Sequence, residues 1–162
     1  MEELIKMAKE AREKTYSPYS KYSVGAALIT KQGKIYTGCN IENYGIMSIC
    51  AERVAFIKAI SEGEKEFKAI AVVGGNHGES IVKTTPCGYC RQFMLEFVDD
   101  EFEIYVIDES ENIITYKIND LLPDGFKKWA IGDGSLLSNL GKKEPSPITQ
   151  VGQKGTGLFF II

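Results

Sequence analysis

The spacing of apolar residues predicts helices and strands along most of the chain. Apolar positions recur at helical spacing in residues 2–14, which predicts a first helix there, with its apolar stripe at Leu4, Ile5, Ala8 and Ala11. Residues 22–30 (YSVGAALIT) and 33–41 (GKIYTGCNI) are rich in β-forming side chains and meet at a short glycine-containing turn. This pattern predicts two adjacent strands joined as a hairpin.

The second half of the pattern continues the alternation of helices and strands. A helix is expected from residue 50 to about residue 60, and another over residues 87–98 (CGYCRQFMLEFV). Between them, residues 67–75 (FKAIAVVGG) are almost continuously apolar, as expected of a strand covered by helices on both faces of its sheet. Residues 101–108 and 112–118 read as two more strands. The sum is an α/β fold with about five strands in one sheet and helices on both faces.

The composition changes near residue 131, and this change suggests a domain boundary. Residues 1–131 have the length and pattern of one domain, whereas residues 132–162 are rich in Gly, Ser, Pro and Lys and end in an apolar run. Two interpretations of residues 132–162 stay open. They form either a tail that packs on the domain or on a neighbouring subunit, or an addition that is foreign to the domain.

Charge and length narrow the class of partner. The chain of 162 residues has a net charge of −3, and no long run of one sign occurs in it. This argues against a nucleic-acid surface and against a polybasic membrane anchor, so a small-molecule partner is expected. The first residues read as an amphipathic helix and not as a signal peptide, which predicts a cytoplasmic location.

Cysteines at the starts of two predicted helices are the main chemical signal. Cys50 begins one helix, and Cys87 and Cys90 begin the other. Helix N-termini favour thiolates, which bind zinc, and a catalytic zinc takes three protein ligands and leaves a fourth position for water. CGYC alone also fits a redox dithiol or half of a structural zinc site. Cys39 is interpreted as a small buried residue and the single histidine, His77, as a solvated loop residue.

Glu52 favours the catalytic interpretation of these cysteines. It follows Cys50 by two residues, at the start of an otherwise apolar helix. A structural zinc site has no need of a carboxylate there, whereas hydrolysis requires a group that carries protons beside the attacking water.

Five segments in order carry a family resemblance. CAE (50–52) and PCGYC (86–90) match the zinc-dependent deaminase pattern. With YSKYSVGAAL, GCNIEN and LLPDGF, they resemble the small homotetrameric cytidine deaminases that bind zinc through three cysteines, over residues 1 to about 130. The resemblance implies a three-layer α/β/α fold with one mixed five-stranded sheet.

The same resemblance implies a reaction and the residues that perform it. One zinc per chain is held by Cys50, Cys87 and Cys90, and a zinc-bound hydroxide converts cytidine or deoxycytidine to uridine or deoxyuridine plus ammonia. Glu52 shuttles the protons, and Arg53 donates hydrogen bonds to ligand sulfurs. Two further candidates for the role of Arg53 follow Cys90, namely Arg91 and Gln92. For Arg91 a plain surface arginine is the alternative.

Substrate contacts also follow from the resemblance. Asn40 and Glu42 match positions that bind the ribose 3′-hydroxyl, and Tyr22 and Ala51 match positions in the nucleoside pocket. Phe126 matches an aromatic residue that covers the base from a neighbouring subunit, which implies a homotetramer with shared active sites. For Tyr22 and Phe126 ordinary core packing is the alternative, and for Asn40 and Glu42 a polar strand end.

Other functions stay open at this level. The stretch from Asn40 to Cys50 is slightly shorter than in typical cytidine deaminases, and related enzymes that deaminate the antibiotic blasticidin S also differ there. A structural zinc module is a second alternative. A nucleic-acid editor is a third, but it needs a positive groove with stacking aromatics, which this acidic chain lacks. A nucleoside deaminase of pyrimidine salvage is the favoured interpretation.

Overall fold

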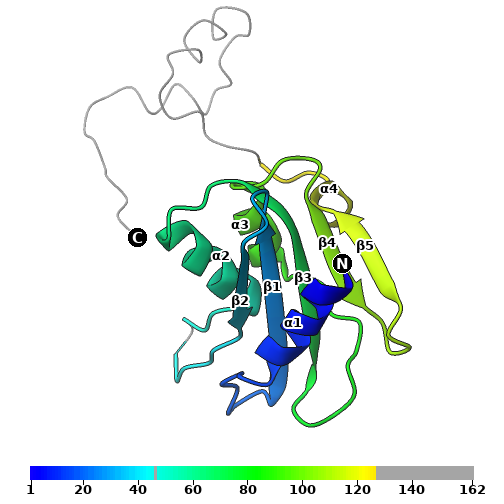
Figure 1. Ribbon diagram of the computed structural model, residues 1–162. Helices are drawn as coiled ribbons and strands as arrows, with labels where there is room; N and C mark the ends of the chain where they lie inside the picture. The colour runs from blue at the N-terminus through cyan, green and yellow to red at the C-terminus, as the bar shows by residue number, and fades with distance from the viewer. Residues whose placement is uncertain (46, 127–162) are drawn as a thin grey trace, which may run out of the picture. The chain divides into compact units, whose positions relative to one another are not determined.

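A mixed five-stranded sheet forms the centre of the computed structural model, which describes residues 1–45 and 47–126. The strand order is β2-β1-β3-β4-β5 (Figure 1). Only β3 and β4 are parallel neighbours, while the other pairs are antiparallel. The strands are β1 (Tyr22–Thr30), β2 (Ile35–Cys39), β3 (Phe67–Asn76), β4 (Glu103–Ile107) and β5 (Ile113–Lys117).

Helices cover both faces of the sheet, as predicted. Helix α1 (Glu2–Arg12) lies on one face, and α2 (Ala51–Ser61) and α3 (Gly88–Leu95) lie on the other (Figure 1). The buried residues form two separate hydrophobic clusters, one on each face of the sheet, because successive residues of a strand point to opposite faces. In β1, Leu28 packs with α2 and α3, while its neighbour Ala27 packs with α1.

The central strand β3 is apolar because both of its faces are covered. Eight of its ten residues are buried, and the two exposed residues are Lys68 and Asn76. Parallel neighbours such as β3 and β4 need a crossover, and α3 supplies it on the face that also carries α2. The face is filled by rings around Phe56, which lies 4.8 Å from the ring of Phe67. Burying one such side chain contributes about 1.5–3 kcal/mol.

The start of α2 lies directly against β2 at Gly38. A Cβ atom at this position would collide with the carbonyl oxygen of Ala51 and would lie 2.7 Å from the nitrogen of Ala55. Only glycine permits this close approach, and it brings the first turn of α2 onto the edge of the sheet.

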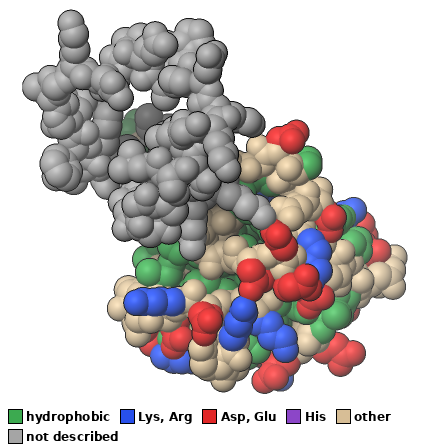
Figure 2. Space-filling model, turned by 90° about the horizontal axis from the view of Figure 1, so that it is seen from above, with side chains coloured by type: hydrophobic (Ala, Val, Ile, Leu, Met, Phe, Trp, Pro, Cys, Tyr) green, Lys and Arg blue, Asp and Glu red, His purple; other side chains and the backbone are tan. Residues whose placement is uncertain are grey.

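Some predicted bounds differ from the structure. The helix predicted over residues 87–98 runs from Gly88 to Leu95, and the segment LLPDGF (121–126) begins at the last residue of a short helix, α4 (Ile118–Leu121). Residues 132–162 and the boundary at residue 131 lie outside the described residues. Within the described ranges, no helix combines the length and the apolar character that a membrane span requires. On the face seen in Figure 2, acidic and basic side chains are interspersed.

Candidate metal centre

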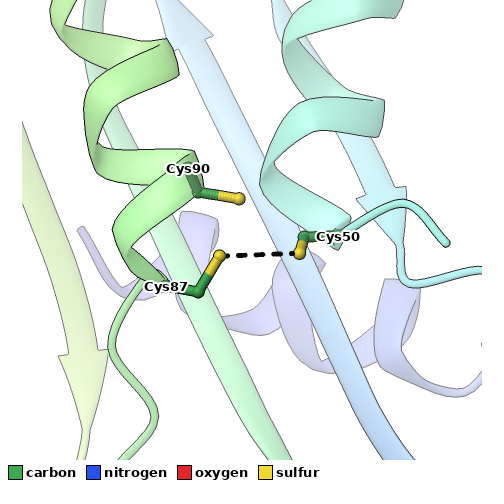
Figure 3. Close-up of side chains that lie close together, drawn as sticks. All are labelled: Cys50, Cys87 and Cys90. Atoms are coloured by element: carbon green, nitrogen blue, oxygen red, sulfur yellow. Dashed lines mark hydrogen bonds between the residues drawn. The ribbon is translucent and has the colours of Figure 1, made fainter. Parts of the chain in front are cut away.

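The three cysteines of the two predicted helix starts meet in space. Cys50 is the N-cap of α2 and Cys87 the N-cap of α3, and Cys90 lies in the first turn of α3. Both helices begin at the same end of the layer, so the sulfurs point toward one another (Figure 3). Neither cap position forms a side-chain hydrogen bond to its helix. The free N–H groups and the positive end of each helix dipole therefore act on the sulfurs.

The spacing of the sulfurs fits zinc. The three Sγ atoms all lie within 4.8 Å of one another, and those of Cys50 and Cys87 are 3.8 Å apart. Two ligands about 2.3 Å from a tetrahedral ion are about 3.8 Å apart, so this pair already has the separation that tetrahedral zinc requires. Three cysteines, with no fourth protein ligand among the residues that the structure describes, match the number of protein ligands in a catalytic site.

The pKa values of Cys50 and Cys90 are shifted in opposite directions, and the arrangement favours metal binding. The pKa of Cys50 lies well below its ordinary value, because Cys90 donates a hydrogen bond to its sulfur and Arg53 also contacts it. The pKa of Cys90 is raised, because the Cys50 sulfur accepts its proton and because Cys90 is buried. A hydrogen bond thus joins these two sulfurs, in a position where a metal cation can bind instead of its proton.

Glu52 is buried beside the cysteines, with 3% of its surface exposed. Burial raises the pKa of its carboxyl group to about 7, and the charge of Cys50 acts in the same direction. A carboxyl group with a pKa near neutrality can both accept and donate a proton, which is the property that general acid–base chemistry needs.

Arg53 contacts the site from the next position of α2. Its Nη2 atom donates to the carbonyl oxygen of Ser48 at 3.2 Å and lies 3.9 Å from the Cys50 sulfur. The charged groups at the start of this otherwise apolar helix therefore have partners: Arg53 faces a sulfur, and Glu52 is enclosed next to the cysteines.

Arg91 and Gln92, the two further candidates for the role of Arg53, donate hydrogen bonds to oxygen atoms of other segments. Arg91 donates from Nε to Pro86 O at 2.6 Å and from Nη1 to Leu121 O at 2.8 Å. Gln92 donates to the carbonyl oxygen of Phe126 at 2.9 Å. Both side chains tie the segment after β5 to α3, and Arg91 also holds the residue before Cys87.

The polar pair Asn40 and Glu42 lies on the segment after β2. Asn40 is bound into the sheet edge, since its Oδ1 accepts from Val24 N at 2.8 Å and its Nδ2 donates to Tyr22 O at 2.9 Å. Glu42 accepts from the backbone N–H of Tyr19 at 2.9 Å. The Glu42 side chain borders a pocket of about 360 Å³ that Tyr19, Ser20, Asn43, Tyr44, Gly45 and Ser48 complete.

The remaining candidates differ in exposure. Tyr22 is half-buried and its hydroxyl lies 2.7 Å from Thr84 Oγ1, while Ala51 is fully buried at the start of α2. Phe126 is 66% exposed, so it is not part of the core of this chain. Cys39, expected to be buried, is only half-buried, and its thiol donates to Lys14 O.

Tyr89 and Thr84 are neighbours of the site that the sequence did not single out. The Tyr89 ring lies against the guanidinium of Arg53, at 4.4 Å, and Thr84 contacts Tyr22. The position of Tyr89 between two ligand cysteines was the only sequence signal for it.

Comparison with known proteins places this geometry in a family. The model of the cytidine and deoxycytidylate deaminase zinc-binding region matches residues 1–106. The chain belongs to this family. It is 46% identical over 129 residues to the cytidine deaminase of Sporosarcina psychrophila, an alignment that covers 79% of this chain and 92% of that protein.

A solved structure supports the same relationship. The crystal structure of cytidine deaminase from Burkholderia pseudomallei has a TM-score of 0.70 and 44% identity, covering 77% of this chain and 98% of that chain. The blasticidin-S deaminase of Bacillus cereus is a more distant relative, 32% identical over 126 residues, covering 75% of this chain and 88% of that protein. The predicted fold class, the zinc-binding deaminase family and the assignment as an enzyme are confirmed.

Proposed function

We propose that this deaminase converts cytidine and deoxycytidine to uridine and deoxyuridine with release of ammonia. The observation that carries the proposal is the buried carboxyl group of Glu52 beside three converging cysteines. The names of the relatives at 46% and 44% identity add the substrate class.

Cys50, Cys87 and Cys90 would hold one zinc ion per chain. When bound, zinc lowers the pKa of water from 15.7 to about 7 and polarises the atom it contacts. Glu52 would accept a proton from the attacking water and deliver it to N3 of the pyrimidine as C4 becomes tetrahedral. It would then take the remaining proton from the new C4 hydroxyl and pass it to the amino group, so that the C4–N bond breaks, ammonia leaves and C4 keeps a carbonyl oxygen. Because Glu52 is buried, bulk water has little access to its carboxyl group and does not compete for the protons that it transfers.

Arg53 would moderate the negative charge of three thiolates. Its guanidinium near the Cys50 sulfur withdraws charge from that ligand, which keeps the metal an effective Lewis acid. For Arg91 and Gln92, the hydrogen bonds described above support an indirect role, through the positions of Pro86 and Phe126.

The sugar and base would be held by residues around the pocket at Glu42. Asn40 already uses both lone pairs of Oδ1, for Thr15 and Val24, and one N–H of Nδ2. It therefore has one N–H left to donate to a ribose hydroxyl, and Glu42 would accept from the same group. The nucleoside pocket would be completed by Tyr22 and Ala51, and by Phe126 of a second subunit.

We further propose a homotetramer that acts in pyrimidine salvage in the cytoplasm. The exposed ring of Phe126 supports an active site completed by a neighbouring subunit, and the four free cysteines suit a reducing compartment. Light scattering that finds a stable and active monomer would refute the assembly.

An absorbance assay of zinc-loaded protein with cytidine, deoxycytidine and blasticidin S tests the substrate class. We expect turnover of both nucleosides, and we expect Glu52→Gln to retain zinc and to lose about 10²- to 10⁴-fold in kcat. If blasticidin S alone reacts, the substrate is this antibiotic and not cytidine or deoxycytidine. The short stretch from Asn40 to Cys50 and the 32% identical blasticidin-S deaminase are the reasons for including it in the assay. A Glu52→Gln variant with normal activity would overturn the mechanism.

A further inference from the structure

Tyr89 connects the two helices that carry the ligand cysteines. It lies in the first turn of α3, between Cys87 and Cys90, and its ring faces the guanidinium of Arg53 in the first turn of α2. The distance from Arg53 Cζ to the centre of the ring is 4.4 Å, within the range of a cation–π contact.

The hydrogen bonds of Arg53 leave room for a further contact to fix its guanidinium. Those to the carbonyl oxygen of Ser48 and to the sulfur of Cys50 both come from Nη2, and the contact with the Cys50 sulfur is long, at 3.9 Å. The Nε atom is buried without a hydrogen-bond partner among the described residues. The guanidinium lies over the Tyr89 ring, so this ring is a contact that can fix its orientation.

We propose that Tyr89 is a positioning residue that acts through Arg53: its ring holds the guanidinium toward the sulfur of Cys50. The inference rests on the proposed metal site and concerns how strongly Arg53 withdraws charge from this ligand. The phenol hydroxyl takes no part, since the contact uses the face of the ring. Tyr89 is 65% exposed, so its removal leaves the core intact.

The proposal predicts a difference between two substitutions of Tyr89. Tyr89→Phe keeps the ring and should behave as wild type. Tyr89→Ala removes it, and the loss of a cation–π contact at an exposed site corresponds to about a two- to fivefold fall in kcat, with KM for cytidine little changed. Ile57→Ala, which truncates an exposed apolar side chain one turn further along α2, is the matched control and should change neither constant.

A spectroscopic measurement separates this role from a structural one. Cobalt(II) loaded in place of zinc gives a sulfur-to-metal charge-transfer band, whose energy falls when a positive group withdraws less charge from sulfur. We expect the band of Tyr89→Ala to move to longer wavelength, and that of Tyr89→Phe to stay in place. In an Arg53→Gln background, Tyr89→Ala should cause no further shift, because the two residues act through one contact.

The outcomes are decisive for the proposal in either direction. A Tyr89→Ala band at the wild-type position, an equal shift in Tyr89→Phe, or a shift that persists without Arg53 would each overturn it. The band is recorded without substrate. A wild-type protein that binds cobalt but deaminates no nucleoside would therefore refute the proposed function and leave the comparison of the variants valid.

Discussion

Replacing Gly38 with alanine tests whether the contact between α2 and β2 sets the geometry of the metal site. The added methyl group would meet the carbonyl oxygen of Ala51, Ala55 N at 2.7 Å and Val54 Cβ at 2.9 Å. These three atoms belong to the first turns of α2, and two of them are backbone atoms that cannot rotate away. The helix start must therefore move, and it carries Cys50 and Glu52.

The size of the effect follows from the collision. Ordinary contacts of a Cβ atom begin at 3.4 Å. Reaching that distance requires a displacement on the order of 1 Å, and a displacement of this size in an active site can cost about 10²-fold in rate. Overpacking of this kind also lowers the free energy of unfolding by about 1–3 kcal/mol. We expect Gly38→Ala to show both losses, measured as kcat for cytidine and by urea unfolding.

Gly88→Ala is the matched control, because Gly88 lies in the first turn of α3, yet a Cβ built on it would have no atom within 4 Å apart from its chain neighbours and the backbone of its own helix. Alanine is a better helix former than glycine, so this variant should keep its activity and gain up to about 1 kcal/mol. If Gly38→Ala proves as active and as stable as Gly88→Ala, the close approach of α2 does not position the site.

Three further predictions concern the carboxylate at the pocket and the metal. Glu42→Gln should raise KM for cytidine, and it should also change the pH dependence of stability. Hydrogen bonds from Ser20 and Tyr19 lower the pKa of Glu42 in the folded protein. The contribution of Glu42 to the free energy of unfolding is therefore present above the unfolded pKa of about 4.3 and is lost as pH falls through the lower folded value. Urea unfolding of both proteins should therefore show a difference that closes in acid; a difference independent of pH would contradict this reasoning. Removal of zinc with a chelator should lower Tm, and added zinc should restore it, since the ion binds the folded state. Cys39→Ala, outside the cluster of sulfurs, should keep one zinc per chain, and a loss of metal in this variant would argue against the three-cysteine site.

Most of the architecture follows from local sequence pattern. The β-forming residues and the short glycine-containing turn in residues 22–41 predict the hairpin of β1 and β2, and the continuous apolar run at residues 67–75 predicts a strand covered on both faces. The cysteines at two helix starts predict converging sulfurs, because neighbouring helix N-termini can face one point. These signals are short-range, and a sequence displays them directly.

The contacts that the sequence does not reveal join distant segments. Arg91 bonds to Leu121, 30 residues away, and Gln92 to Phe126, 34 residues away. Their partners are backbone carbonyl groups, which every residue carries, so no side-chain pattern marks them. The contact of Tyr89 with Arg53 depends on the rotation of α3 relative to α2, and only the packed structure fixes that rotation.

The cysteines at the helix starts also couple the metal to the fold. An N-cap position normally holds Ser, Thr, Asp or Asn, whose oxygen satisfies a free N–H, and losing such a cap costs about 1 kcal/mol. Here Cys50 and Cys87 occupy the caps of α2 and α3 without forming that bond. The unsatisfied N–H groups and helix dipoles instead favour negative charge on the sulfurs, which attracts a divalent cation. Each helix therefore has a metal ligand where it would otherwise have a capping side chain. The missing caps lower the free energy of unfolding, and a bound metal ion would raise it again.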